Sequence, residues 1–375
     1  MSTETEMSGA GVKRLVIAAA GTGGHVMPGL AVAEVMRGRG AEIEWIGTTS
    51  GMEGELVERR GIPFSGIAFR GVRGRGLAGA VKGVFALVRA FFAARALLRK
   101  AKPDAVFSTG GYVAVPVGWA AKTLGIPLVL MNCDADLLMS TKLLLPAARR
   151  LACGFDGPAA SHAGAKAVVT GNPVRSAIVA IPAPDERLSG RAGPLKLFVF
   201  GGSLGAQVLN DVVPEALALL SPEERPEVLH QTGRGRDEAV RARYAELGIE
   251  ARVVPFIHDM AAEYEACDLI VCRAGATSIS EIAAAGAAAV LVPFIARTTA
   301  HQEGNARFMA GEGAAVHMPQ KAFTAEALAA ELRRLTRADI LALARNARKM
   351  AKPDAASAVA RLIDEAAGRL ELPHS

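Results

Sequence analysis

The sequence predicts an α/β protein with two similar halves, each a doubly wound parallel sheet covered by helices on both faces. Short apolar runs typical of buried strands alternate along the chain with segments that have the apolar spacing of helices. Each half opens with the same unit, a strand followed by a glycine turn and a helix. Aromatic residues make up only 5% of the chain while glycine occurs 40 times, which favours helices packed closely on parallel strands.

The first half begins with a strand at residues 15–17, a glycine turn from Gly21 to Gly24 and a helix over residues 30–36. A second glycine turn, at residues 108–112, follows a strand at residues 105–107. Short apolar runs predict the remaining strands of this half. They lie at residues 43–46, within 62–69, at 127–131 and at 167–169.

The second half follows a segment rich in proline, glycine and charge, residues 181–194, which we interpret as a linker. The opening unit is then repeated. Its helix is expected to carry Asn210 and Asp211 near its exposed side. The repeated unit and the later elements are a strand at 195–200, a third glycine turn at 201–205, a helix over 206–220, strands at 228–230, 252–254, 269–271 and 290–292, and a helix over 277–285.

These patterns divide the chain into a first domain, residues 1–175, and a second domain, residues 176–352. The last segment, residues 353–375, predicts a helix that begins with proline and aspartate and has a plausible N-terminal cap. We expect this helix to return to the first domain.

Charge and cysteine content narrow the possible partners. The formal net charge of +6 suits nucleic acid, an anionic membrane or a phosphorylated substrate, but nucleic acid is disfavoured because stacking aromatics and known binding modules are lacking. The 4 cysteines form no C-x-x-C pair, so we predict free buried thiols and neither a zinc site nor a redox dithiol.

The polar, acidic first eight residues differ from a signal peptide. No uncharged apolar run is long enough to span a bilayer, so we expect a cytosolic or membrane-surface protein.

A basic stretch at residues 59–102 contains no acidic residue, and apolar residues recur within it at helical spacing from Val81 to Phe92. One interpretation is an ordinary helix whose apolar stripe packs on the sheet while its basic face is solvated. The other is a surface that meets anionic lipid, which also explains the missing acids. The candidate membrane contacts are Arg73, Arg75, Lys82, Phe85, Arg89 and Phe91.

The glycine turns do not match known nucleotide fingerprints. The first turn breaks the G-x-G-x-x-G pattern and the second predicted strand ends without a carboxylate, which disfavours binding of NAD or FAD. Neither turn is followed by Gly-Lys-Ser/Thr, which disfavours a P-loop. His25 lies where a strand ends and a helix begins, so we favour a proton-accepting role over a structural cap. Asp134 and Asp136 form a D-x-D, which we interpret as a helix-start cap, so no metal is predicted.

In the second half, Glu281 lies one turn into a predicted helix, where it could accept two hydrogen bonds from a ribose. The alternative is favourable placement of a carboxylate near the positive end of the helix. The neighbouring small and hydroxyl residues favour ligand binding, and residues 293–306 are rich in side chains that bind sugars.

Together these stretches resemble the GT-B glycosyltransferases, whose two Rossmann-like domains face each other across a cleft. Among them the chain is similar to the bacterial UDP-N-acetylglucosamine:undecaprenyl-pyrophosphoryl-N-acetylmuramoyl-pentapeptide N-acetylglucosaminyltransferases, which convert lipid I to lipid II in peptidoglycan synthesis. The matching stretches are GTGGHVMPGLAVA (21–33), GVRGRG (71–76), GGYV (110–113), GNPVR (171–175), GGSLGA (201–206), FI (256–257), SEIAAAG (280–286) and VPF (292–294).

The resemblance implies that the second domain binds UDP-N-acetylglucosamine. Ile257 would meet the uracil, Glu281 the ribose, and Gln302 the sugar. Ser203 would contact phosphate and Arg175, near the interdomain cleft, would meet the donor. The full set of implied donor contacts is Thr22, Gly23, Gly24, Asn132, Asp134, Arg175, Ser203, Ile257, Ala276, Thr277, Ser278, Glu281 and Gln302.

The first domain would bind lipid I, with Gly21 to Gly24, Gly110, Gly111 and Tyr112 cradling its pyrophosphate. The implied reaction is an inverting displacement with His25 as the base, helix N-termini stabilising the leaving diphosphate, and no cofactor. The resemblance also implies peripheral attachment to the cytoplasmic face of the inner membrane, and partners in cell-wall synthesis and division.

The chain departs from the family at several positions. Asn132-Cys133-Asp134 replaces a Glu-Gln-Asn stretch, so either Asn132 or Asp134 stands in for the family's asparagine. Leu204 replaces a glutamine, and the approach to Gln302 is changed. Two rival functions are compatible with the same residues. The first is another enzyme of the same fold, either a UDP-N-acetylglucosamine 2-epimerase or a glycolipid transferase. The second is a non-catalytic carrier of a nucleotide sugar or polyprenol. A basic, apolar first-domain surface disfavours the soluble epimerase.

Overall fold

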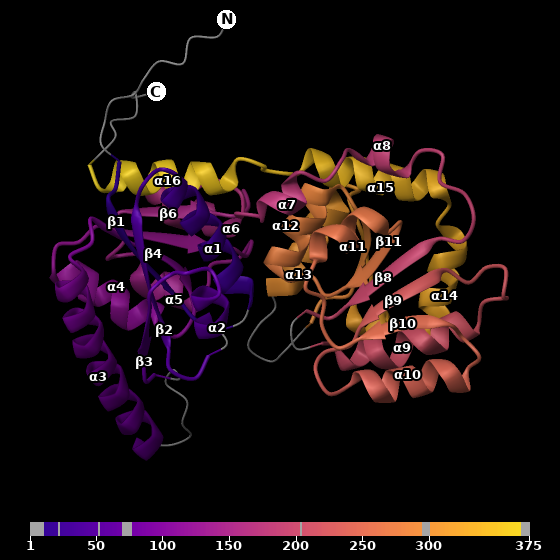
Figure 1. The fold of residues 1–375 in the computed structure, drawn as a ribbon, viewed down its shortest axis with the longest axis horizontal. Coiled ribbons are helices and arrows are strands. Elements are labelled where there is room, and N and C mark those ends of the chain that lie inside the picture. The colour runs from indigo at the N-terminus through magenta and orange to yellow at the C-terminus, as the bar shows by residue number, and fades with distance from the viewer. Residues whose placement is uncertain are drawn as a thin grey trace, which may run out of the picture. The chain divides into compact units, whose positions relative to one another are not determined.

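The computed structural model describes residues 11–21, 23–51, 53–69, 77–202, 205–294 and 301–368. The chain divides into two compact units (Figure 1). The N-terminal unit comprises Met1–Pro173 and Asp354–Ser375, and the C-terminal unit comprises Val174–Pro353.

The N-terminal unit is built on a parallel sheet in the order β3-β2-β1-β4-β5-β6-β7. The strand order reverses between β1 and β4, and ligands of open α/β sheets bind beyond the carboxyl ends of the strands at such a switch point. The strands are β1 Arg14–Ala19, β2 Glu42–Thr48, β3 Phe64–Ile67, β4 Ala105–Gly110, β5 Leu128–Asn132, β6 Arg150–Cys153 and β7 Ala167–Val169.

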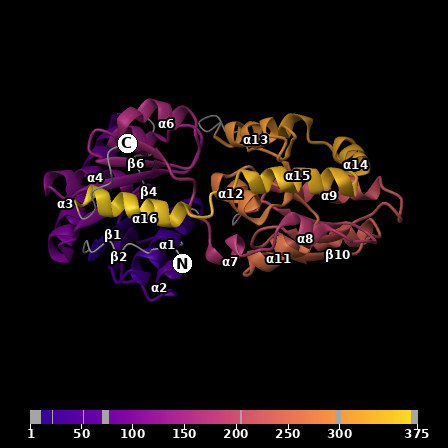
Figure 2. The same cartoon turned by 90° about the horizontal axis from the view of Figure 1, so that it is seen from above.

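Helices α3, α4 and α5 share one core cluster with this sheet, while α1 and α16 pack against each other. Helix α16 crosses β4, β5 and β6 (Figure 2), where the buried Asp364 accepts the Val12 N–H at 2.8 Å and pairs with Arg39 at 3.2 Å. The helices are α1 Gly23–Gly38, α2 Glu53–Glu58, α3 Leu77–Ala101, α4 Ala114–Thr123, α5 Met139–Leu144, α6 Pro158–Ala163, η1 Gly164–Lys166 and α16 Ala355–Ala366.

The C-terminal unit repeats this plan with a parallel sheet in the order β10-β9-β8-β11-β12-β13, which reverses between β8 and β11. The strands are β8 Lys196–Phe200, β9 Glu227–Gln231, β10 Ala251–Val254, β11 Leu269–Cys272, β12 Ala288–Leu291 and β13 Val316–His317. The helices are α7 Ser176–Val179, α8 Pro184–Leu188, α9 Gln207–Ala218, α10 Asp237–Glu246, α11 Met260–Ala266, α12 Ala276–Ala285, α13 His301–Gly311, η2 Gln320–Ala322, α14 Ala325–Arg334 and α15 Arg337–Lys349.

Two parallel sheets covered by helices confirm the predicted fold class, and all cysteines are free and buried as expected. Three local expectations are wrong. The supposed linker at residues 181–194 contains α8 and is packed into the C-terminal unit, because the buried Arg187 donates to the carbonyls of Cys267 and Gly286. Asn210 is 4% exposed rather than on the outside of α9. Asp354 precedes α16 but makes no side-chain capping hydrogen bond.

Helix α3 contradicts the interpretation in which the larger apolar residues of the basic stretch pack on the sheet. It buries an alanine-rich face through Ala90, Ala94 and Leu98. The larger side chains of the opposite face remain exposed and form what we call the α3 patch: Val81, Val84, Phe85, Val88 and Phe92. Phe91 instead packs partly against the core, with its ring edge-on to Phe92. Within the described residues, no helix has both the length and the apolar character needed to cross a bilayer.

Candidate active site

The first glycine turn lies at the switch point of the N-terminal sheet, and buried side chains hold the strand that leads into it. Ser108 donates its hydroxyl to the Ala18 carbonyl at 2.6 Å, and the Trp45 indole donates to the Ala19 carbonyl at 2.9 Å. These two hydrogen bonds fix the end of β1 from both neighbouring strands. The turn is therefore presented by a rigid frame.

Glu53 is a functional candidate that the sequence analysis missed. Its side chain is fully buried, and one carboxylate oxygen accepts the Thr48 N–H at 2.7 Å and the Thr48 hydroxyl at 2.6 Å. The other oxygen accepts the Gly21 N–H at 3.4 Å. Strand β2 ends at Thr48 without a carboxylate, and Glu53, five residues later in the chain, provides one. Its hydrogen bond to Gly21 supports the first glycine turn from its buried side. The position of Glu53 in the first turn of α2, directly after that strand, was the available signal.

The second glycine turn packs directly on the first. Gly111 has φ +86°, and a Cβ atom there would overlap the main chain of Ala20. A Cβ atom on Gly110 would lie 3.2 Å from Nδ1 of His25. Thr109 donates its hydroxyl to the His25 carbonyl at 2.6 Å. The structure therefore brings together Gly21, His25, Gly110 and Gly111 from two separate parts of the sequence, and Tyr112 follows them as a 41% exposed ring.

His25 is partly exposed as a residue, but its Nδ1 is buried and has no hydrogen-bond partner among the described residues. Burial lowers the pKa of His25, while the negative charge of Asp134 and the main chain of Thr109 oppose that effect. A lowered pKa keeps the imidazole neutral near pH 7, which is the form that accepts a proton.

Asn132 and Asp134 occupy different environments. Asn132 is fully buried, donates to the carbonyls of Asp134 and Asp136, and accepts the Leu138 N–H. Its amide therefore shapes its own loop. Asp134 is partly exposed and close enough to His25 to influence its charge. Helix α5 begins only at Met139, with Leu138 as its N-cap residue, so the D-x-D does not cap a helix as expected.

In the C-terminal unit, Glu281 on α12 is 5% exposed and joins two partners into a cluster. Arg175 donates to Oε1 of Glu281 from Nε at 3.1 Å and from Nη2 at 2.7 Å. Tyr264, which is fully buried, donates its hydroxyl to Oε2 at 3.2 Å. Burial raises the pKa of Glu281, and Arg175 and Tyr264 counteract that effect.

Gly205, at the end of the third glycine turn, packs against main chain as Gly111 does. A Cβ atom on Gly205 would overlap the carbonyl of Thr232, and Asn210 donates to that same carbonyl at 3.1 Å. Buried His230 in turn contacts Asn210 at 3.2 Å and the Tyr244 hydroxyl at 3.0 Å. This polar core network holds the turn against the end of β9.

Several of the remaining predicted donor residues lie at the starts of α12 and α13. Ala276 is buried, while Thr277 and Ser278 are partly exposed at the first turn of α12. The Ile257 side chain is 8% exposed. Gln302 uses its side-chain carbonyl to accept the Phe294 N–H at 2.8 Å, and buried Asn305 donates to the Ala274 carbonyl at 3.0 Å.

Some expected positions lie outside the described residues: Thr22, Arg73, Arg75, Ser203, Leu204 and the approach to Gln302 at 297–300. Among the residues that are described, no group of three or more histidine, cysteine or acidic side chains is arranged to hold a metal.

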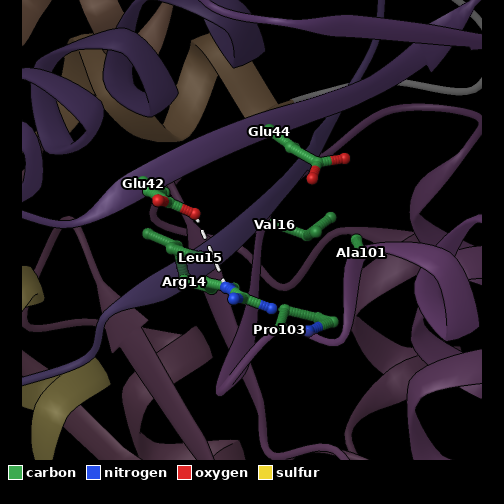
Figure 3. Close-up of a pocket in the computed structure, with 7 residues that line it drawn as sticks. All are labelled: Arg14, Leu15, Val16, Glu42, Glu44, Ala101 and Pro103. Atoms are coloured by element: carbon green, nitrogen blue, oxygen red, sulfur yellow. Dashed lines mark ion pairs between the residues drawn. The ribbon is translucent and has the colours of Figure 1, made fainter.

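A separate hollow at the amino ends of β1 and β2 is lined by Arg14 and Glu42, which form an ion pair at 3.5 Å (Figure 3). Its volume of about 10 Å³ suits a water molecule and excludes a sugar nucleotide.

Comparison with known proteins identifies the family. The Glycosyltransferase family 28 N-terminal domain matches residues 15–152, and the family's C-terminal domain matches residues 196–362. A relative from Janthinobacterium sp. (strain Marseille) is 49% identical over 94% of this chain and 99% of its own length. A relative from Methylibium petroleiphilum is 51% identical over 94% of this chain and 97% of its own length. Both are named UDP-N-acetylglucosamine--N-acetylmuramyl-(pentapeptide) pyrophosphoryl-undecaprenol N-acetylglucosamine transferase.

The chain belongs to this family of N-acetylglucosamine transferases, within glycosyltransferase family 28. The crystal structure of Acinetobacter baumannii MurG superposes with a TM-score of 0.78 at 36% identity, covering 94% of this chain and 99% of that one. The UDP-GlcNAc 2-epimerase from Neisseria meningitidis shares only the fold, with a TM-score of 0.64 at 12% identity over 93% of this chain and 98% of that one. Membership of family 28 confirms the GT-B fold expected from the motifs.

The contact between the two glycine turns of this transferase can be tested with a matched pair of variants. Gly111→Ala is expected to lower the free energy of unfolding and to reduce activity at least about a hundredfold, because the Cβ atom collides with the Ala20 main chain. Gly125→Ala has a similar positive φ of +71° but nothing within 4 Å, so it should cost only about 1 kcal/mol and keep its activity. Urea unfolding followed by tryptophan fluorescence reports this unit, since Trp45 and Trp119 both lie in it. Equal effects of the two substitutions would contradict the contact.

Proposed function

We propose that the protein transfers N-acetylglucosamine from UDP-N-acetylglucosamine to the 4-hydroxyl of the muramyl sugar of undecaprenyl-pyrophosphoryl-N-acetylmuramoyl-pentapeptide (lipid I), with inversion, giving lipid II. The observation that carries this proposal is 45–51% identity, over nearly the whole of both chains, to transferases named for that activity. Two sheets with glycine turns at their switch points, and a neutral histidine beside one of them, fit a transfer reaction between two phosphorylated substrates.

We assign the nucleotide sugar to the C-terminal unit. Glu281 would accept hydrogen bonds from the ribose hydroxyls, and the main chain at Ile257 would meet the uracil, since that side chain is buried. The diphosphate would lie at the third glycine turn and the N-terminus of α12, where main-chain N–H groups and the helix dipole favour negative charge. Gln302, held to the Phe294 main chain through its carbonyl, would offer its amide hydrogens to the sugar.

We assign the lipid pyrophosphate to the paired glycine turns of the N-terminal unit. The transfer forms a bond between O4 of the muramyl sugar and the anomeric carbon. The bond from that carbon to the phosphate oxygen breaks, and UDP leaves with the electron pair. His25 takes the hydroxyl proton, and Asp134 stabilises the imidazolium that results. Asp134 is thus preferred over Asn132 as the stand-in for the family's asparagine, because the Asn132 amide is engaged by its own loop.

The α3 patch suits attachment to the membrane that carries the lipid substrate. Phe85 is 70% exposed and Phe92 62% exposed, and the exposed Lys82 and Arg89 lie on the same helix. On the adjacent α4, Trp119 is 38% exposed. A helix that exposes apolar side chains among basic residues has the composition typical of helices that bind the surface of an anionic membrane. We therefore place the protein peripherally on the cytoplasmic face of the cell membrane, where other cell-wall synthesis and division proteins would be its partners.

The first test is turnover. The protein is incubated with UDP-N-acetylglucosamine and a short-chain lipid I analogue, and both UDP and the disaccharide product are measured. We expect equal amounts of the two, and no release of UDP without the acceptor beyond slow hydrolysis. Conversion of UDP-N-acetylglucosamine alone to its 2-epimer, or binding without any product, would instead support the epimerase or the carrier.

The second test concerns the base. His25→Ala should lower kcat by about 10²–10⁴ while leaving the KM for UDP-N-acetylglucosamine nearly unchanged. In the unaltered enzyme, activity should be full above the pKa of His25 and fall as the pH drops through it. Because burial lowers that pKa, the fall should lie below the ordinary histidine value of about 6.5. The exposed His162 provides the control His162→Ala, which should retain both rate and pH profile. Near-normal turnover of His25→Ala would remove the base assignment alone.

The third test concerns the membrane. Phe85→Ser with Phe92→Ser should weaken cosedimentation with anionic vesicles at least about tenfold, because burial of each ring contributes about 1.5–3 kcal/mol. Binding of the unaltered protein should also weaken with salt. Leu219→Ser, at a 47% exposed apolar residue of the C-terminal unit, is the matched control and should bind normally. Equal binding of all three proteins would contradict the role of the α3 patch.

A further inference from the structure

The Glu281 carboxylate is nearly saturated by hydrogen bonds from the protein itself. Oε1 accepts two hydrogen bonds from the Arg175 guanidinium, at 3.1 and 2.7 Å, and Oε2 accepts one from the Tyr264 hydroxyl at 3.2 Å. A carboxylate offers about four acceptor positions, two on each oxygen. Counting the partners among the described residues, one position remains, on Oε2. A ribose diol that bridges both oxygens needs a position on Oε1 that Arg175 occupies.

The two partners of Glu281 differ in how freely they can move. Tyr264 is fully buried, and the rings of Phe198 and Phe200 both lie edge-on to it with centroids 6.1 Å away. The Arg175 side chain is 28% exposed and lies at the start of the four-residue helix α7. A buried carboxylate needs a counterion, which explains why Arg175 pairs with Glu281. Arg175 is the partner that can leave.

We propose that the nucleotide donor exchanges this ion pair: the ribose hydroxyls replace Arg175 on Oε1 of Glu281, and the released guanidinium binds the diphosphate of the same donor. This inference rests on the proposed function. Glu281 lies five residues after the start of α12, about 7 Å along the helix axis from the N-terminus where the diphosphate is expected. A long side chain spans that distance, and a guanidinium is suited to bidentate contact with phosphate. Tyr264 keeps its hydrogen bond to Oε2 and holds the carboxylate in place throughout.

The exchange couples two parts of one ligand. UDP brings the phosphates that receive Arg175, so breaking the ion pair is compensated. Uridine has the same ribose but no phosphate, so it must displace Arg175 from Glu281 without providing a new partner. The ion pair therefore discriminates against nucleosides and favours nucleoside diphosphates, beyond the direct attraction between Arg175 and phosphate.

Binding of uridine and of UDP to Arg175→Gln tests the exchange. Titrations are followed by calorimetry in a mildly alkaline buffer, so that Glu281 stays ionised. UDP should bind about tenfold to a hundredfold more weakly, as expected for the loss of a charge-assisted hydrogen bond. Uridine should bind at least threefold more tightly than to the unaltered protein, because no guanidinium competes for Oε1. This opposite response is the decisive result, and a residue that only supports the fold would not produce it.

Two further variants complete the experiment. Tyr264→Phe should weaken uridine and UDP by the same factor, since its hydroxyl serves Glu281 in both states. Arg175→Lys, which retains a charge, should fall between the unaltered protein and Arg175→Gln for both ligands and covers the case in which Arg175→Gln does not fold. Parallel weakening of uridine and UDP in the Arg175 variants, or no change in either, would overturn the exchange. Failure of the unaltered protein to bind UDP would instead contradict the proposed function.

Discussion

The candidate active site of the N-terminal unit depends on a main-chain contact, the approach of the second glycine turn to the carbonyl end of β1. Gly111 lies so close to Ala20 that no side chain fits between them. A Cβ atom on Gly110 would lie 3.2 Å from the His25 ring, and the Thr109 hydroxyl donates to the His25 carbonyl. The histidine is thereby placed by the backbone of a different strand, and its burial, which lowers its pKa, is a consequence of the same contact. The close packing of the two turns therefore leaves His25 with the lowered pKa that its proposed role as the base requires.

In the C-terminal unit, a glycine turn is also placed by a close main-chain contact. Gly205 lies against the carbonyl of Thr232, just as Gly111 lies against Ala20. Here the support comes from a buried polar network, in which Asn210 binds that carbonyl and His230 binds Asn210. Burial lowers the pKa of His230 to about 4, so this histidine remains neutral and serves as a fixed hydrogen-bonding group. The two histidines thus differ in their surroundings: among the described residues Nδ1 of His25 has no hydrogen-bond partner, whereas both ring nitrogens of His230 are engaged.

Much of the fold could be predicted from local signals, because parallel strands and glycine turns have short-range signatures. The failures involve partners that are distant in sequence. Asn210 has the spacing of an exposed helical position, but it is buried and donates to the carbonyl of Thr232, directly after β9. Residues 181–194 have the composition of a linker, but Arg187 finds three carbonyl acceptors in the core. On α3, small alanines pack on the sheet and leave the larger apolar residues outside, a choice that periodicity alone does not determine.

The two buried carboxylates, Glu53 and Glu281, show why the site could be predicted only in part. A carboxylate beside a turn that binds anions would repel its ligand, so its charge has to be directed elsewhere. Glu53 does this by accepting hydrogen bonds from Thr48 and Gly21, behind the turn. Glu281 does it by pairing with Arg175. Both acids lie within the first two turns of a helix that follows a strand, and their partners distinguish them: Glu53 is engaged by the main chain and Glu281 is paired with a partly exposed arginine. Those partners are set by tertiary packing, and in the proposed exchange the release of Arg175 is what would make Glu281 available to a ribose.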